Sequence, residues 1–207
     1  MSQSARDDTA RLMAGVPSHN MALYHRIRFL AGDPAAVIET PADAPAPKRT
    51  LIIRDIEMER ARKHARVDEV FCPAEFTPSQ GLSGDRETAT AQAAAEALRR
   101  MGVTRAIADR TLPLIFADAV QNAGVTVECD LDMGVLDRRR KDAEEIDRLR
   151  ESQRVTEQAM RMALELIANA PADAEGVLNH AGDVLTSERV KNAIDAFLME
   201  RSFANPR

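Results

Sequence analysis

The sequence is poor in aromatic residues and in cysteine. Aromatic side chains make up 3% of the 207 residues and tryptophan is absent, so we expect no stacking platform for bases or sugars. The two cysteines, Cys72 and Cys129, lie far apart and outside any CxxC spacing. This pattern indicates two buried, reduced thiols in a cytoplasmic protein.

Long apolar runs and charge blocks are also missing. The opening residues MSQSARDDTARLMAGVP have no apolar region typical of a signal peptide, and no later run reaches the length of a membrane span. The net charge is −5 with a pI near 5.5, and neither sign gathers in one segment. We therefore expect a cytoplasmic protein without nucleic acid or membrane as partner.

Local signatures of catalysis and metal binding are absent as well. The four histidines, His19, His25, His64 and His180, form neither HxH nor HExxH, and no GxSxG motif occurs. No catalytic residue, metal ligand or cofactor is therefore assigned to this chain.

What the sequence does contain is an alternation of strand and helix patterns between residues 50 and 130. Strands are predicted at 35–39, 49–55, 69–71, 103–109 and 125–130, and helices at 56–65, 86–102 and 110–124. The first two strands are predicted to form a hairpin around the Pro/Ala-rich loop at 40–48, and residues 21–29 a short helix. The alternation predicts an α/β fold with a mixed, largely parallel sheet flanked by helices, preceded by a flexible lead-in at 1–18.

The pattern changes after residue 140. No Gly or Pro occurs from Lys141 to Asn169, which predicts one helix of about 43 Å. A long stripe at alternating steps of three and four residues, and a second, shorter stripe in the later half, predict that the helix packs on one side at first and on two sides later. The long stripe consists of Ile146, Leu149, Gln153, Thr156, Met160, Ala163 and Ile167. The shorter stripe consists of Val155, Ala159, Met162 and Leu166. A small hairpin near 179–183 and a helix capped by Thr186 or Ser187 are expected to follow.

Two loops are candidate ligand-binding sites. Asp109 and Arg110 follow a predicted strand, where ligands bind in open α/β sheets, although an Asp–Arg pair tying the loop to the sheet explains them too. The stretch GLSGDRET resembles a glycine-rich loop that opens a helix and holds an anion. It lacks the Lys-Ser/Thr of a P-loop, and a turn at Gly84 with Asp85 as helix cap accounts for it equally.

The segment LDRRRKDAEEIDRLRESQRVTEQAMRMALELI resembles the junction of Xaa-Pro peptidases, prolidases and creatinases. In that family an Arg, a Lys and an E-I-x-x-[LI]-R stretch open the long helix between the two domains. The matching residues here are Arg140, Lys141, Glu145, Ile146, Leu149 and Arg150. The resemblance implies a creatinase-type N-terminal domain at 19–139, followed at 140–207 by the linker helix and an incomplete start of the pita-bread catalytic domain.

Further properties follow from the resemblance alone. The family's catalytic domain holds two divalent metals, usually Mn, Co or Zn, with two Asp, one His and two Glu. No residue of this chain matches these ligands, so we expect a truncated chain that does not hydrolyse peptides on its own. The resemblance also implies a homodimer in which the N-terminal domain covers an active site, with Tyr24, His25 and Arg28 as possible cross-subunit contacts.

Two alternatives stay open. The chain could be a stand-alone creatinase-N-like module that binds or dimerises without hydrolase activity. It could also be an independent α/β enzyme that binds a small molecule through Asp109, Arg110 and the loop at 81–85.

Overall fold

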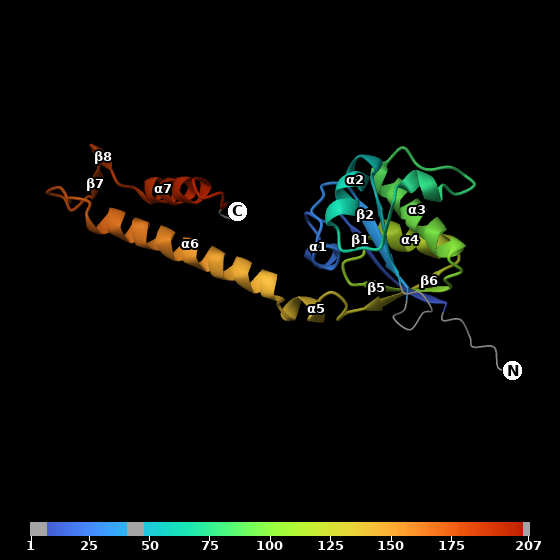
Figure 1. The fold of residues 1–207 in the computed structure, drawn as a ribbon. Coiled ribbons are helices and arrows are strands. Elements are labelled where there is room, and N and C mark those ends of the chain that lie inside the picture. The colour runs from blue at the N-terminus through green and yellow to red at the C-terminus, as the bar shows by residue number, and fades with distance from the viewer. Residues whose placement is uncertain (1–7, 41–47, 205–207) are drawn as a thin grey trace. The chain divides into compact units, whose positions relative to one another are not determined.

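The computed structural model describes residues 8–40 and 48–204, and these fall into two compact units that divide between Arg140 and Lys141 (Figure 1). The strands of the first unit are β1 (Thr9–Gly15), β2 (Ala35–Glu39), β3 (Arg49–Ile53), β4 (Glu69–Phe71), β5 (Arg105–Asp109) and β6 (Thr126–Asp130). Its helices are α1 (Met21–Ile27), α2 (Asp55–His64), the 3-10 turn η1 (Pro73–Phe76), α3 (Arg86–Arg100), α4 (Leu114–Asn122) and α5 (Leu136–Arg139).

The first unit is built on a mixed six-stranded sheet in the order β4-β3-β2-β1-β5-β6. Strand β2 pairs antiparallel with both neighbours, and the other pairings are parallel. The predicted α/β class with a largely parallel sheet is therefore confirmed. The predicted hairpin is also present, since Ala35 pairs with Ile53 and Glu39 with Arg49. Most of its loop, residues 41–47, lies outside the described residues.

The predicted lead-in is wrong for the residues that the structure describes. Strand β1 lies between β2 and β5, and its side chains from Leu12 onward are buried. Thr9 and Arg11 gave the segment a polar character in the sequence, and their burial pattern shows that Arg11 alone faces solvent fully. Apart from Thr9, the segment lacks the β-branched residues that usually reveal a strand, so its place in the sheet comes from tertiary pairing.

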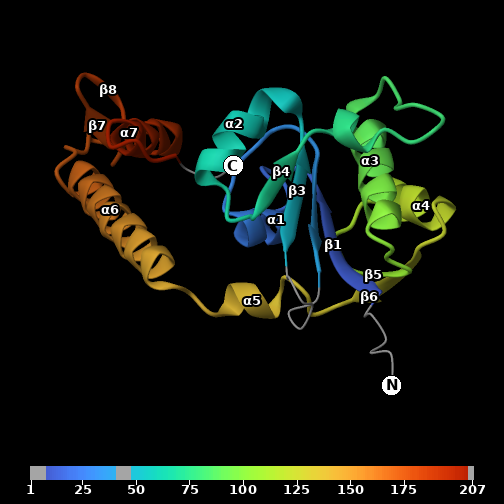
Figure 2. The ribbon, with the colours of Figure 1, turned by 45° about the vertical axis from the view of Figure 1, so that its right-hand side comes forward.

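Two apolar layers cover the two faces of this sheet (Figure 2). Helices α1 and α2 supply the core on one face, where Leu23 and Ile27 pack with Leu51 and Ile53. Helices α3 and α4 supply the other, in which the many alanines of α3 let its backbone approach the strands closely. Helix α3 begins because the Asp85 carboxylate accepts a hydrogen bond from the Thr88 amide at 2.8 Å. Sheet and helices thus form three layers.

The second unit consists of a long helix, a hairpin and a further helix. These are α6 (Ala143–Ala168), β7 (Asn179–His180), β8 (Asp183–Val184) and α7 (Ser187–Met199). A capping box formed by Asp142 and Glu145 starts α6, so the helix spans about 39 Å, slightly less than predicted. The hairpin is confirmed, and Thr186 is the residue that caps α7.

The residues of α6 that are buried differ from those expected from the sequence. The buried residues of α6 are Val155, Ala159 and Ala163, spaced four positions apart on one side of the helix. Leu149 and Met160, which belong to the long stripe, are exposed. Helix α7 packs against α6, and within this unit one partner helix can cover one side only.

Candidate functional site

The carboxyl ends of five strands meet at one edge of the sheet, because β1, β3, β4, β5 and β6 all run in the same direction. The chain proceeds outward from β1 through β2 to β4 on one side, and from β5 to β6 on the other. In open α/β sheets ligands bind where the strand order reverses in this way. A ligand site is therefore expected where β1 and β5 end, at Gly15 and Asp109.

Asp109 is almost fully buried at this point. Its Oδ2 accepts hydrogen bonds from the Thr111 amide at 3.1 Å and from the Thr111 hydroxyl. Its Oδ1 is inaccessible to solvent and has no hydrogen-bond partner among the described residues. Asp109 thus holds the turn after β5 with one carboxylate oxygen and keeps the other as an unused acceptor.

Asn20 connects the same turn to the first helix. Its Oδ1 accepts from the amides of Ala22 and Leu23, both at 3.1 Å, and so caps α1. Its Nδ2 donates to the Ala14 carbonyl at 3.2 Å and to the Thr111 hydroxyl at 2.9 Å. One amide side chain therefore joins β1, α1 and the turn after β5. The sequence signal for the capping role is an Asn directly before the helix.

Arg110, in contrast, is exposed, and no ion pair between it and Asp109 occurs in the described parts of the chain. The expected Asp–Arg tie is therefore corrected: Asp109 does tie the loop to the sheet, but through Thr111. The loop at 81–85 is not joined to Asp109 or Arg110 by any hydrogen bond or ion pair between described residues. No such contact therefore joins the two loops that were proposed as one small-molecule site.

Tyr24, His25 and Arg28 lie on or directly after α1. The Arg28 amide donates to the Tyr24 carbonyl at 2.6 Å, and Arg28 itself has a left-handed backbone with φ of 51°. All three side chains are half-buried. They share one short segment, while Leu23 and Ile27 of α1 are buried in the core.

Their neighbour Arg26 has the more extensive contacts, and the sequence analysis missed it. Glu39, at the end of the buried strand β2, accepts hydrogen bonds from Arg26 Nε at 2.5 Å and from Arg26 Nη2. It also accepts from Arg49 Nε at 2.6 Å. Asp137 of α5 lies 3.6 Å from Arg26 Nη1. The sequence signal for this cluster is Glu39 at the end of an otherwise apolar strand. A buried carboxylate requires a hydrogen-bonding or charged partner.

The electrostatics of this cluster follow from its geometry. Burial raises the pKa of Glu39, but the hydrogen bonds and charges of Arg26 and Arg49 outweigh it and lower that pKa below its ordinary value. The hydrogen bond to Glu39 raises the pKa of Arg26. Glu39 and Arg26 are therefore both charged at neutral pH, and the cluster links α1, β2, β3 and α5. No acid–base chemistry follows from it.

The described residues also form no metal-binding cluster and no disulfide. Across residues 8–40 and 48–204, no three His, Cys, Asp or Glu side chains gather closely enough to hold a metal ion. Cys72 and Cys129 are free thiols, as expected, but Cys129 is exposed and Cys72 half-buried, because both stand at or after the ends of strands near the sheet margins. Within the same ranges no helix combines the length and apolarity needed to cross a membrane.

Comparison with known proteins gives one kind of match. No model of a protein family matches the sequence, and no curated protein does. Solved structures do match. The Xaa-Pro dipeptidase from Bacillus anthracis superimposes with a TM-score of 0.67 at 16% identity, and the prolidase from Pyrococcus horikoshii OT3 with 0.61 at 15%. The chain folds like part of a Xaa-Pro peptidase.

The extent of these matches is informative. Both cover 93% of this chain but 44% of the other, and the X-Pro aminopeptidase from Thermotoga maritima MSB8 gives 92% and 45% at a TM-score of 0.58 and 12% identity. The chain therefore spans less than half the length of the structures it matches. At such identities the similarity establishes the fold alone.

Proposed function

We propose that this chain is the N-terminal, non-catalytic portion of a Xaa-Pro peptidase-like metallohydrolase. The observation that carries the proposal is the match over 93% of the chain to a prolidase and a Xaa-Pro dipeptidase. A match of that extent includes residues of both units, since neither unit alone makes up 93% of the chain. A chance likeness confined to the α/β sheet would cover the first unit only.

The junction between the units supports the same proposal through its local chemistry. Glu145, in the E-I-x-x-[LI]-R stretch, accepts a hydrogen bond from the Asp142 amide at 3.0 Å, while the Asp142 carboxylate accepts from the Glu145 amide at 2.9 Å. The glutamate of the motif thus fixes the residue that caps the long helix, Asp142. Arg150, its last residue, pairs with Asp147 one turn earlier. The motif therefore has a physical role in starting this helix.

The metal chemistry belongs, in this proposal, to residues outside the chain. The described side chains do not fit a divalent metal pair, because no three potential ligands come together. We derive no catalytic step from them. A full-length protein would supply the ligands of two Mn, Co or Zn ions in its second half, and its substrate would be a peptide with proline after the first residue.

The contribution of the present chain would be dimerisation and closure of an active site. Tyr24, His25 and Arg28 are the proposed contacts, since aromatic and arginine side chains are frequent interface anchors. They lie on or directly after one short helix and are half-buried in this chain. A homodimer in sizing experiments coupled to light scattering, weakened by Tyr24→Ala, would support this role, and a monomer at all concentrations would contradict it.

Hydrolysis of Xaa-Pro dipeptides tests the main proposal. The 207-residue chain, loaded with Mn²⁺, is expected to release no amino acid above the rate of Mn²⁺ alone. Turnover by this chain would show that the catalytic groups are present and would refute the proposal.

A stand-alone dimerisation module is the alternative, and limited proteolysis separates the two. No residue of α7 is buried, which favours the main proposal, because a helix of a finished module would bury its apolar face. We expect early cleavage within 170–204. Protection of that segment would favour the module.

A further inference from the structure

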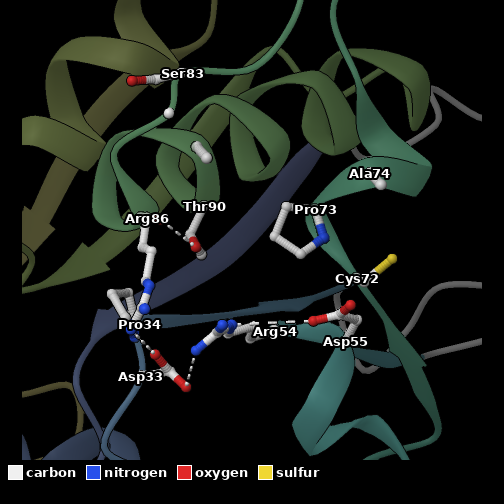
Figure 3. A pocket seen from close by; sticks show the side chains of 12 residues that line it. Asp33, Pro34, Arg54, Asp55, Cys72, Pro73, Ala74, Ser83, Arg86 and Thr90 are labelled. Atoms are coloured by element: carbon white, nitrogen blue, oxygen red, sulfur yellow. Dashed lines mark hydrogen bonds and ion pairs between the residues drawn. The ribbon is translucent and has the colours of Figure 1, made fainter.

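An open cavity of about 260 Å³ lies at the carboxyl ends of β3 and β4, and neither Asp109 nor Asn20 lines it (Figure 3). It is bounded by the segment before β2, the first residues of α2, the turn after β4 and the start of α3. The side chains that line it are Asp33, Pro34, Arg54, Asp55, Cys72, Pro73, Ala74, Ser83, Gly84, Arg86, Ala89 and Thr90. The loop that resembled an anion-binding turn, at 81–85, thus contributes part of this wall.

Two guanidinium groups from different elements converge in the cavity. Arg86 Nη1 lies 3.2 Å from Asp33 Oδ1, and Arg54 Nη1 lies 3.5 Å from Asp33 Oδ2. Figure 3 shows both side chains turned toward this carboxylate. Asp33 is 15% exposed, so it forms the floor that holds the two arginines side by side.

Most of the arginine donors in the cavity are unused. A guanidinium has five N–H groups, and one hydrogen bond from each side chain, both to Asp33, is present among the described residues. The Nε of Arg54 lies 4.0 Å from Asp55, which is beyond hydrogen-bond distance. Two neighbouring guanidinium groups with unused N–H donors match the two oxygens of a carboxylate.

Part of the remaining wall is apolar, while Asp55, Ser83 and Thr90 add polar side chains to it. Pro34, Pro73, Ala74 and Ala89 present rigid or small side chains without hydrogen-bonding groups. Ligand sites of this kind combine an apolar lining with a few convergent polar groups, and the volume lies just below the usual range for drug-sized molecules. The cavity therefore suits a small ligand with one anionic end and an apolar body.

We propose that this cavity binds a small organic monocarboxylate with a compact apolar body. The carboxylate bridges Arg54 and Arg86 above Asp33, and the body packs against Pro34, Pro73 and Ala89. This inference stands on the cavity itself and does not depend on the proposed peptidase relationship.

The charges of the cavity favour a monoanion over phosphate. Two arginines, Arg54 and Arg86, face two carboxylates, Asp33 and Asp55, so the charged side chains of the lining sum to zero. One negative charge on a ligand is therefore easier to accommodate than two. A doubly charged phosphate would also approach Asp55 and would meet a helix start already occupied by the Asp85 carboxylate, which accepts from the Thr88 amide and hydroxyl. The loop at 81–85 thus serves as wall and helix cap, without cradling an anion.

Amide chemical-shift titration of the 207-residue chain with pivalate tests the proposal. Pivalate carries a carboxylate on a compact apolar group, and pivalamide has the same shape without charge. We expect saturable shifts at the amides of Ser83, Gly84 and Arg86 with pivalate, and none with pivalamide. Arg86→Gln is expected to raise the Kd about tenfold or more, because a hydrogen bond to a charged group is lost.

Arg99→Gln is the matched control, since Arg99 lies on the same helix and pairs with Glu96 at 2.8 Å outside the cavity. It is expected to leave the Kd unchanged. Arg86 is 65% exposed, so its replacement should not disturb folding, and an unchanged amide spectrum away from the cavity checks this. Absence of saturable shifts with pivalate, equal shifts with pivalamide, tighter binding of inorganic phosphate, or an unchanged Kd in Arg86→Gln would each overturn the proposal.

Discussion

Replacing Glu39 by Gln tests the charge cluster that joins α1, β2 and β3. The variant keeps the shape of the side chain and one carbonyl oxygen, but it removes the negative charge between Arg26 and Arg49. Both guanidinium groups then face a neutral amide. Because the Glu39 side chain is 11% exposed, water cannot replace the lost charge.

The expected loss lies between two limits. Exposed ion pairs contribute below about 1 kcal/mol, whereas breaking a fully buried pair costs about 3–5 kcal/mol. The arginines are 25% and 29% exposed and can be partly rehydrated. We therefore expect Glu39→Gln to lower the free energy of unfolding by about 2–3 kcal/mol at pH 7.

Acid should remove this difference. The pKa of Glu39 is lowered in the folded protein, so its ionised form contributes stability above the pKa of the unfolded chain, and the contribution is lost as pH falls through the folded value. The difference between the wild-type and variant curves should therefore shrink as the pH falls below the ordinary pKa of a glutamate, about 4.3.

Urea unfolding followed by circular dichroism at 222 nm measures both effects, since the chain has no Trp and one Tyr for fluorescence. Glu59→Gln is the matched control, because Glu59 forms an exposed i,i+4 pair with Lys63 and should change stability by less than about 0.5 kcal/mol. The reasoning is refuted if Glu39→Gln behaves like this control at pH 7, or if its effect is the same at pH 7 and pH 3.

Three other substitutions are predicted from single contacts. Phe116→Ala, at a fully buried site, should cost about 3–5 kcal/mol in urea unfolding, and a cost under 1 kcal/mol would contradict its place in the core. Asn20→Ala should cost about 1–2 kcal/mol through loss of the α1 cap, whereas Asn20→Asp keeps the cap oxygen and should lose less, so equal losses would argue against capping. Gly134→Ala places a Cβ 3.0 Å from a side chain of α1 at a φ of 71°, while Gly102→Ala meets nothing within 4 Å at a similar φ of 74°. The first should therefore lower the melting temperature more than the second, and equal shifts would exclude the steric contact.

The sequence predicts most of the first unit because its signals are local. Strand 35–39 and strand 69–71 are found at the predicted residues, and Asp85 and Thr186 cap the helices that follow them. Turn residues, caps and periodicity act within a few positions, so they can be read without knowledge of the fold.

Features that depend on distant partners were not predicted. Strand β1 has a partly polar sequence and is a strand because β2 and β5 flank it. The pairing of Glu39 with Arg26 and Arg49 joins three elements, and the convergence of Arg54 and Arg86 on Asp33 joins three more. Such clusters of charge follow from the topology, which a single sequence does not give.

The position of β1 has a consequence for the order in which the sheet can form. Its partner on one side, β2, follows closely in the chain, whereas on the other side Thr9 pairs with Arg105, 96 positions later. During synthesis at about 5–20 residues per second, β1 therefore waits several seconds with one edge unpaired. An unpaired edge is a template for wrong pairing with other chains. Slow closure of this long-range contact, more than the helices, should set the folding rate of the first unit and its tendency to aggregate when newly made.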